Sequence, residues 1–193
     1  MAYLLQHLLT DSAARRPDWP AVTAGDRVLT YSELDRLSNQ VARALIAQGV
    51  APGDPVGVLA PKSAASVVGV FGALKAGACY VPLDPGAPAT WLYAIMRDSG
   101  IAVVLADSRK APAVSAMAGS VPQLRSVIVV GPHWGYEDGG VAWAGPPGLA
   151  VLPWKAVLAE PGGPVAGDPA IETDLAYILY TSGSTGTPKG VMI

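Results

Sequence analysis

Cysteine is almost absent from this sequence of 193 residues, which contains only Cys79. A single thiol cannot form an internal disulfide, and it excludes any metal site built from several cysteines. Its neighbours in ACYVPL are apolar, so we expect Cys79 to be a buried core thiol and not a nucleophile. Histidine is also scarce, with only His7 and His133 in the sequence. We therefore assign no metal ligand in this sequence.

Charged residues are sparse as well, at 15% of the chain, with a formal net charge of -2 and a pI near 5.6. Such a balance offers no basic patch, which excludes a nucleic acid as an expected partner. Hydrophobic residues make up 51% of the sequence, too many for a disordered chain. The composition therefore predicts a folded domain with a sizeable core.

Long apolar runs are missing too. One uncharged apolar run, residues 63–74, lies between Lys62 and Lys75 and is too short to span a bilayer. The N-terminal stretch MAYLLQHLLTDSAARRP has no basic start and is interrupted by Gln6 and His7, so it does not fit a secretion signal. We expect no membrane partner and a cytoplasmic location.

The N-terminal part predicts a helix over about residues 3–16, followed by two short β runs around Gly25-Asp26. Thr30 and, three residues later, Glu33 have the spacing of a capping box. Apolar residues then recur with helical period until Gly49. This pattern predicts a long amphipathic helix between Thr30 and Gly49.

Apolar strands alternate with helices through the middle of the chain. The strands are expected at residues 55–60, 79–83, 101–106 and 126–130. Unbroken apolar strands separated by helices are typical of a parallel sheet covered on both faces. We therefore predict an α/β fold, a doubly wound, largely parallel sheet with flanking helices. The helix between the first two strands is expected to have Val67, Val70, Phe71 and Leu74 on one face.

Residues 131–168 interrupt this alternation with a stretch rich in Gly, Pro and Trp. We predict an irregular insertion here, with one short helix near residues 154–159. Trp134, Trp143 and Trp154 could form a ligand-stacking set, but we favour packing of the insertion. The alternation is expected to resume with a strand at residues 175–180.

The stretch YTSGSTGTPKG, residues 180–190, concentrates glycine, hydroxyl side chains and one lysine directly after that strand. Glycines let the backbone approach a ligand closely, and hydroxyl and free N–H groups can converge on an anion. Lys189 supplies a compensating charge. The composition favours phosphate binding over the alternative, a surface turn that binds nothing.

This stretch matches neither of the common phosphate-binding motifs. A Walker loop has Ser or Thr after its lysine, whereas Gly190 follows Lys189, and the paired glycines that open a Rossmann fingerprint are absent. Pro188 disfavours a helical backbone at Thr187. We therefore expect a strand, a loop and a second strand, not a loop that opens a helix.

Three stretches resemble the adenylate-forming superfamily, and most of all the amino-acid adenylation domains of nonribosomal peptide synthetases. LAYILYTSGSTGTPKG (175–190) resembles the phosphate-loop signature, and LTYSEL (29–34) and LKAGACYVPLDP (74–85) resemble the first two core motifs of adenylation domains. DSG at residues 98–100 also fits, whereas Thr90-Trp91 departs from the Glu-Arg pair that is common there. The resemblance implies that residues 1–193 are the N-terminal portion of one adenylation domain.

The resemblance implies an AMP-forming acid-thiol ligase that works in two steps. A carboxylate attacks the α-phosphate of Mg-ATP to give an acyl adenylate and pyrophosphate, and a thiol then displaces AMP. The implied partners are ATP, a carboxylic or amino acid, and the phosphopantetheine thiol of a carrier protein or CoA. The residues implied to wrap the β- and γ-phosphates are Thr181, Ser182, Gly183, Ser184, Thr185 and Gly186. Lys189 is implied to neutralise these phosphates and the departing pyrophosphate.

In the superfamily, the residues that select the acid, contact adenine, bind Mg²⁺ and hold the ribose all follow the phosphate loop. This sequence ends at Ile193, three residues after that loop. We therefore expect a truncated part of the enzyme that is inactive alone, with the Mg²⁺ ligand outside it. Two other interpretations stay open: an acyl-CoA or aryl-acid synthetase of the same superfamily, or a noncatalytic module that binds a nucleotide or a partner.

Overall fold

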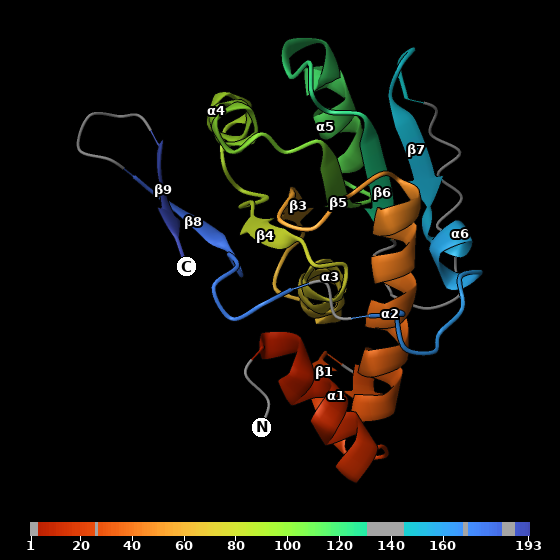
Figure 1. Cartoon of the computed structure of the whole chain (residues 1–193). Helices are drawn as coiled ribbons and strands as arrows, with labels where there is room; N and C mark the ends of the chain where they lie inside the picture. The colour runs from red at the N-terminus through yellow and green to blue at the C-terminus, as the bar shows by residue number, and fades with distance from the viewer. Residues whose placement is uncertain (1–3, 26, 131–144, 168–169, 183–187) are drawn as a thin grey trace.

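The computed structural model describes residues 4–25, 27–130, 145–167, 170–182 and 188–193 (Figure 1). The elements run in chain order as α1 (Leu5–Arg15), β1 (Pro20–Ala24), β2 (Arg27–Thr30), α2 (Tyr31–Ala47), β3 (Pro55–Leu59), α3 (Ala64–Lys75), β4 (Cys79–Pro82), α4 (Ala89–Ser99), β5 (Val103–Asp107), α5 (Ala111–Met117), the 3₁₀ helix η1 (Ala118–Ser120), β6 (Ser126–Val130), β7 (Ala150–Pro153), α6 (Trp154–Leu158), β8 (Ile178–Ser182) and β9 (Pro188–Met192).

A five-stranded sheet with the order β4-β3-β5-β6-β7 forms the centre of the molecule. Every neighbouring pair in it is parallel. The chain first moves from β3 to β4 and then crosses to the other side of β3 to add β5. This change of direction is typical of doubly wound folds.

Alternate residues of the strands fill two cores, one on each face of the sheet. In β5, Val103 and Leu105 belong to the core that includes residues of α2, α3 and α6, whereas Val104 and Ala106 belong to the core with residues of α4 and α5. Successive side chains point to opposite faces of a strand, so a strand covered on both sides must be apolar throughout. The predicted doubly wound α/β fold is confirmed.

The long helix α2 begins at the predicted capping box. The Thr30 hydroxyl accepts a hydrogen bond from the Glu33 amide at 3.3 Å, and the Glu33 carboxylate accepts one from the Thr30 amide at 2.9 Å. Two backbone donors at the start of the helix are thereby satisfied. The motif LTYSEL thus has a structural explanation in this fold.

Helix α3 packs closely on α2 through small residues. Val67, Val70 and Phe71 are only partly buried, and the buried positions are mainly alanine and glycine. The reason is the close approach of α2: a Cβ at Gly72 would lie 2.6 Å from the Cβ of Val41. The four residues predicted on one face differ in burial: Leu74 is buried, whereas Val67 and Phe71 are partly buried and pack against the core.

The prediction that residues 131–168 form an irregular insertion needs correction for residues 150–158. Ala150–Pro153 form β7, which pairs in parallel with β6 at the edge of the sheet, and α6 follows directly. The short helix predicted near residues 154–159 is therefore confirmed, and Trp154 packs in the core as favoured. Trp134 and Trp143 lie outside the described residues.

The strand expected at residues 175–180 does not rejoin the central sheet. Strand β8 pairs instead with β9 in a separate antiparallel ribbon, which Figure 1 shows beside α4 and β4. One isolated parallel bridge, between Tyr80 and Tyr177, connects this part of the chain to β4. Within the described ranges, no helix has the length and apolar character needed to cross a membrane.

Candidate functional site

The predicted phosphate loop lies between the two strands of the β8–β9 ribbon. Tyr180 pairs with Gly190, Thr181 with Lys189 and Ser182 with Pro188. The two strands expected on either side of the loop are therefore confirmed, and their pairing brings residues 182 and 188 together. Gly183, Ser184, Thr185 and Gly186 lie outside the described residues, so their phosphate contacts stay predictions.

Thr181 and Lys189 occupy one face of the ribbon. Side chains of directly opposed residues lie on the same face of an antiparallel pair, and both of these residues are exposed. They present a hydroxyl and an ammonium group next to the loop. The ribbon thus places two of the predicted phosphate-binding residues side by side, with their polar groups accessible.

The opposite face of the ribbon is anchored to the rest of the molecule. The Tyr180 hydroxyl donates a hydrogen bond of 2.6 Å to Oδ2 of Asp98, at the end of α4. Burial raises the pKa of Tyr180, and the Asp98 carboxylate raises it further. The phenol therefore stays protonated and remains the donor in this contact.

A second anchor lies at the start of β8. The rings of Tyr80 and Tyr177 stack with their centroids 5.1 Å apart, and the Tyr80 amide donates a hydrogen bond of 3.1 Å to the carbonyl of Ala176. Tyr80 belongs to β4, within the motif LKAGACYVPLDP. This motif thus fixes the strand that leads into the phosphate loop.

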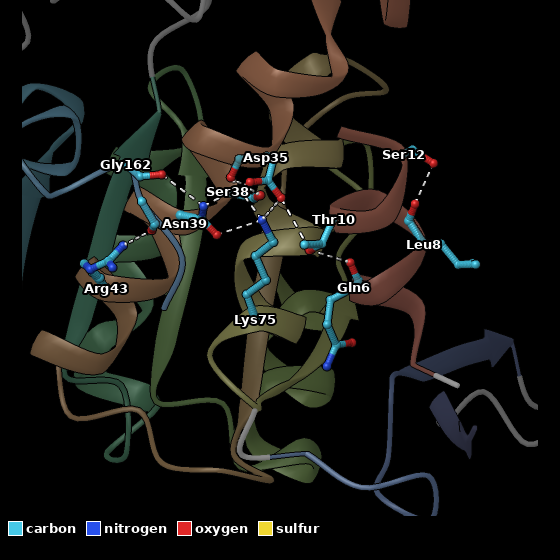
Figure 2. Close-up of polar contacts among 11 residues, drawn as sticks. Gln6, Leu8, Thr10, Ser12, Asp35, Ser38, Asn39, Arg43, Lys75 and Gly162 are labelled. Carbon is cyan, nitrogen blue, oxygen red and sulfur yellow. Dashed lines mark hydrogen bonds and ion pairs between the residues drawn. The ribbon is translucent and has the colours of Figure 1, made fainter. Parts of the chain in front are cut away.

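Lys75, another residue of that motif, lies in a buried polar cluster (Figure 2). The Lys75 ammonium donates to Oδ1 of Asp35 at 2.7 Å, to the Asp35 carbonyl at 3.0 Å and to Oδ1 of Asn39 at 2.8 Å. An ammonium group has three donors, and all three have acceptors within the protein. The cluster therefore joins α2 to α3 and has no donor left for a ligand.

Polar side chains of α2 hold the segment after α6 through its carbonyl oxygens. Gln40 donates to the carbonyls of residues 158 and 160, Asn39 to that of residue 162, and Arg43 to those of residues 161, 163 and 164. These contacts satisfy backbone groups that a segment without secondary structure leaves unpaired. They connect α2 to the segment that follows α6.

A comparison with protein families gives one match over nearly the whole chain. Residues 9–193 match the model of the AMP-binding enzyme family. The chain belongs to the AMP-binding enzyme family. The resemblance carried by the phosphate-loop stretch and the two core motifs is thereby confirmed.

Curated relatives of this chain include a tripeptide synthetase. The chain is 41% identical over 194 residues to phosphinothricin tripeptide synthetase PhsC of Streptomyces viridochromogenes, covering 98% of the chain and 15% of that protein. It is 33% identical to tyrocidine synthase 3 of Brevibacillus parabrevis, covering 98% of the chain and 2% of that protein. The chain thus spans a small part of these relatives.

Solved structures, one of them of a CoA ligase, share the fold. The anthranilate CoA ligase AuaEII, in complex with anthranoyl-AMP, matches with a TM-score of 0.82 and 26% identity, covering 97% of this chain and 34% of that one. ATP-bound MatB from Rhodopseudomonas palustris matches with a TM-score of 0.78 and 28% identity, and the match covers 100% of this chain and 35% of that one. This chain spans about a third of the length of each solved chain.

The sequence alone does not indicate that Tyr180 contacts Asp98. Both residues lie in stretches that the resemblance singles out, but they are 82 positions apart. The signal available in the sequence is the polar Asp98 in the last turn of α4 and the tyrosine directly before the loop. Neither feature alone indicates that the two side chains meet.

Proposed function

We propose that the chain is the N-terminal portion of an adenylation domain that activates a carboxylic acid with ATP. The acid is an amino acid in the interpretation we favour, which the peptide-synthetase relatives support. An aryl or acyl acid is the alternative, and the match to the anthranilate CoA ligase AuaEII supports an aryl acid. The observation that carries the proposal is the ribbon that presents Thr181 and Lys189 on either side of the phosphate loop.

The proposed reaction has two steps. A carboxylate oxygen of the acid attacks the α-phosphorus of ATP, and the bond from that phosphorus to the bridging oxygen breaks, which releases pyrophosphate. The sulfur of a thiol then attacks the acyl carbon and displaces AMP. The thiol belongs to the phosphopantetheine of a carrier protein, or to CoA.

Charge explains the role proposed for the loop. The leaving pyrophosphate carries several negative charges, and donors fixed in place before the reaction stabilise it better than mobile water. The hydroxyl and N–H groups of Thr181, Ser182, Gly183, Ser184, Thr185 and Gly186 would wrap the β- and γ-phosphates. Lys189 would contribute the positive charge. Among the described residues, no cluster of His, Cys, Asp or Glu could hold a metal ion, so we assign no residue of this chain to Mg²⁺.

Replacing Lys189 tests the proposal. In the complete gene product that contains this chain, Lys189→Ala should slow acid-dependent exchange of labelled pyrophosphate into ATP about 100-fold, the usual effect of removing one charge-stabilising donor. Lys155→Ala is the matched control, because Lys155 is exposed on α6 and far from the loop in sequence. Equal exchange rates for Lys189→Ala and the unmodified protein would contradict the role proposed for the loop.

A further inference from the structure

Tyr180 connects the phosphate-loop ribbon to α4 through one short hydrogen bond. Its hydroxyl donates to Asp98 Oδ2 at 2.6 Å, the length expected when the acceptor is ionised. The Tyr180 ring is partly buried against the core that contains α4 residues. The contact therefore combines a charge-assisted hydrogen bond with packing of the aromatic ring.

The Tyr180 ring also packs against Gly190 of β9. Gly190 is the residue opposite Tyr180, and a Cβ there would lie 3.1 Å from Cζ of Tyr180, 3.3 Å from its hydroxyl oxygen and 2.9 Å from Cγ2 of Ile178. Only glycine leaves room for the ring in this position without a shift of its neighbours. One side chain therefore packs on both strands that bound the loop.

The two faces of the ribbon have different environments. Ile178 and Tyr180 point to one face and pack against the core, whereas Leu179 and Thr181 alternate with them and are exposed. Thr181 follows Tyr180 directly, and Lys189 precedes Gly190. Anchoring one face of the ribbon thus fixes the position of Thr181 and Lys189 on the other.

We propose that Tyr180 is a positioning residue, whose hydrogen bond to Asp98 holds Thr181 and Lys189 where the phosphates of ATP bind. The inference rests on the proposed function, because it gives the anchor a purpose in pyrophosphate release. Tyr180 contacts neither ATP nor the acid in this account. It acts through the backbone of β8 and the packing on Gly190.

The test uses the complete gene product and steady-state pyrophosphate exchange. Tyr180→Phe removes only the hydroxyl, and we expect a fall of about tenfold in kcat/KM for ATP, since small displacements of positioning groups have effects of this size or larger. The KM for the acid should stay unchanged. A structural role alone would not separate the two substrates in this way.

Asp98 provides the rescue and a second variant. Asp98→Ala should cause the same loss as Tyr180→Phe, while Asp98→Asn keeps an oxygen acceptor and should restore most of the rate. If Tyr180→Phe fails to fold, the comparison of Asp98→Ala with Asp98→Asn tests the positioning role. Tyr93→Phe is the matched control, because the Tyr93 hydroxyl contacts Arg97 within α4 and lies outside the ribbon.

The outcomes separate this inference from the proposed function. If the unmodified protein catalyses exchange and Tyr180→Phe matches it in kcat/KM for ATP, the positioning role is wrong and the proposed function stands. Equal rates for Asp98→Ala and Asp98→Asn would also overturn the positioning role. If the unmodified protein shows no exchange with any acid, both proposals fail.

Discussion

At the scale of single residues, the buried charge of Lys75 is stabilised by the side chains around it. Its side chain is 7% exposed, and its ammonium contacts the carboxylate of Asp35, which is 21% exposed. Burial lowers the pKa of Lys75, while the hydrogen bond and the charge of Asp35 oppose that change. A buried charge of this kind is tolerated only while its partner is present.

Replacing Lys75 should therefore destabilise the fold. Lys75→Met keeps the length of the side chain but leaves Asp35 and Asn39 without their shared donor, and we expect the free energy of unfolding to fall by about 3 kcal/mol. Urea unfolding followed by circular dichroism measures this. Lys155→Met, at an exposed position, should change stability by less than about 0.5 kcal/mol. Equal effects of the two variants would show that the Lys75 cluster does not stabilise the fold.

Local chemistry explains which single residues could be predicted from the sequence. The capping box of Thr30 and Glu33 depends on residues three positions apart, and the burial of Cys79 follows from its apolar neighbours. The pair formed by Lys75 and Asp35 joins residues 40 positions apart. No local pattern indicates such a contact, because only the packing of α2 on α3 brings the two side chains together.

Between elements, Gly72 of α3 allows this helix to pack closely against Val41 of α2. Gly72→Ala would place a methyl group against the Val41 side chain, where the Cβ atoms would be 2.6 Å apart. Overlap in a packed core costs about 1–3 kcal/mol, and the higher helix propensity of alanine returns about 1 kcal/mol. We expect a net loss of about 1–2 kcal/mol in the free energy of unfolding, measured by urea denaturation.

Two variants give this measurement its controls. Gly119→Ala adds a methyl group where no atom lies within 4 Å, so it should cause no comparable loss. In the double variant, Val41→Ala should reduce the additional cost of Gly72→Ala, since the overlapping side chain is shortened. A Gly72→Ala variant as stable as the unmodified chain would contradict the close packing of α2 on α3.

Elements whose place depends on distant partners could not be predicted from the sequence. Strand β7 has only four residues, includes Pro153 and gains its position by pairing with β6, because strand formation depends on tertiary context. Residues 175–180 have the apolar composition of the other strands, but the short connection between β8 and β9 allows only antiparallel pairing of these two strands. The same composition therefore leads to a different sheet.

Across the whole molecule, the alternation of apolar strands and helices was sufficient to predict the doubly wound sheet. The sequence also predicted that the phosphate-loop stretch lies between two strands, and both strands are present. It could not predict what holds this ribbon in place, since the anchors on α4 and β4 are contacts between distant residues. The sequence thus predicts the two strands that flank the loop, whereas the contacts that hold them in place are found only in the structure.

The most direct test of the central claim is the exchange of labelled pyrophosphate into ATP by the complete gene product that contains this chain. The account predicts that label enters ATP only when a suitable carboxylic acid is present, and that AMP is the nucleotide product when a thiol acceptor is added. Exchange with no acid in a broad panel of amino, aryl and acyl acids would contradict the account. So would acid-dependent cleavage of ATP to ADP and phosphate.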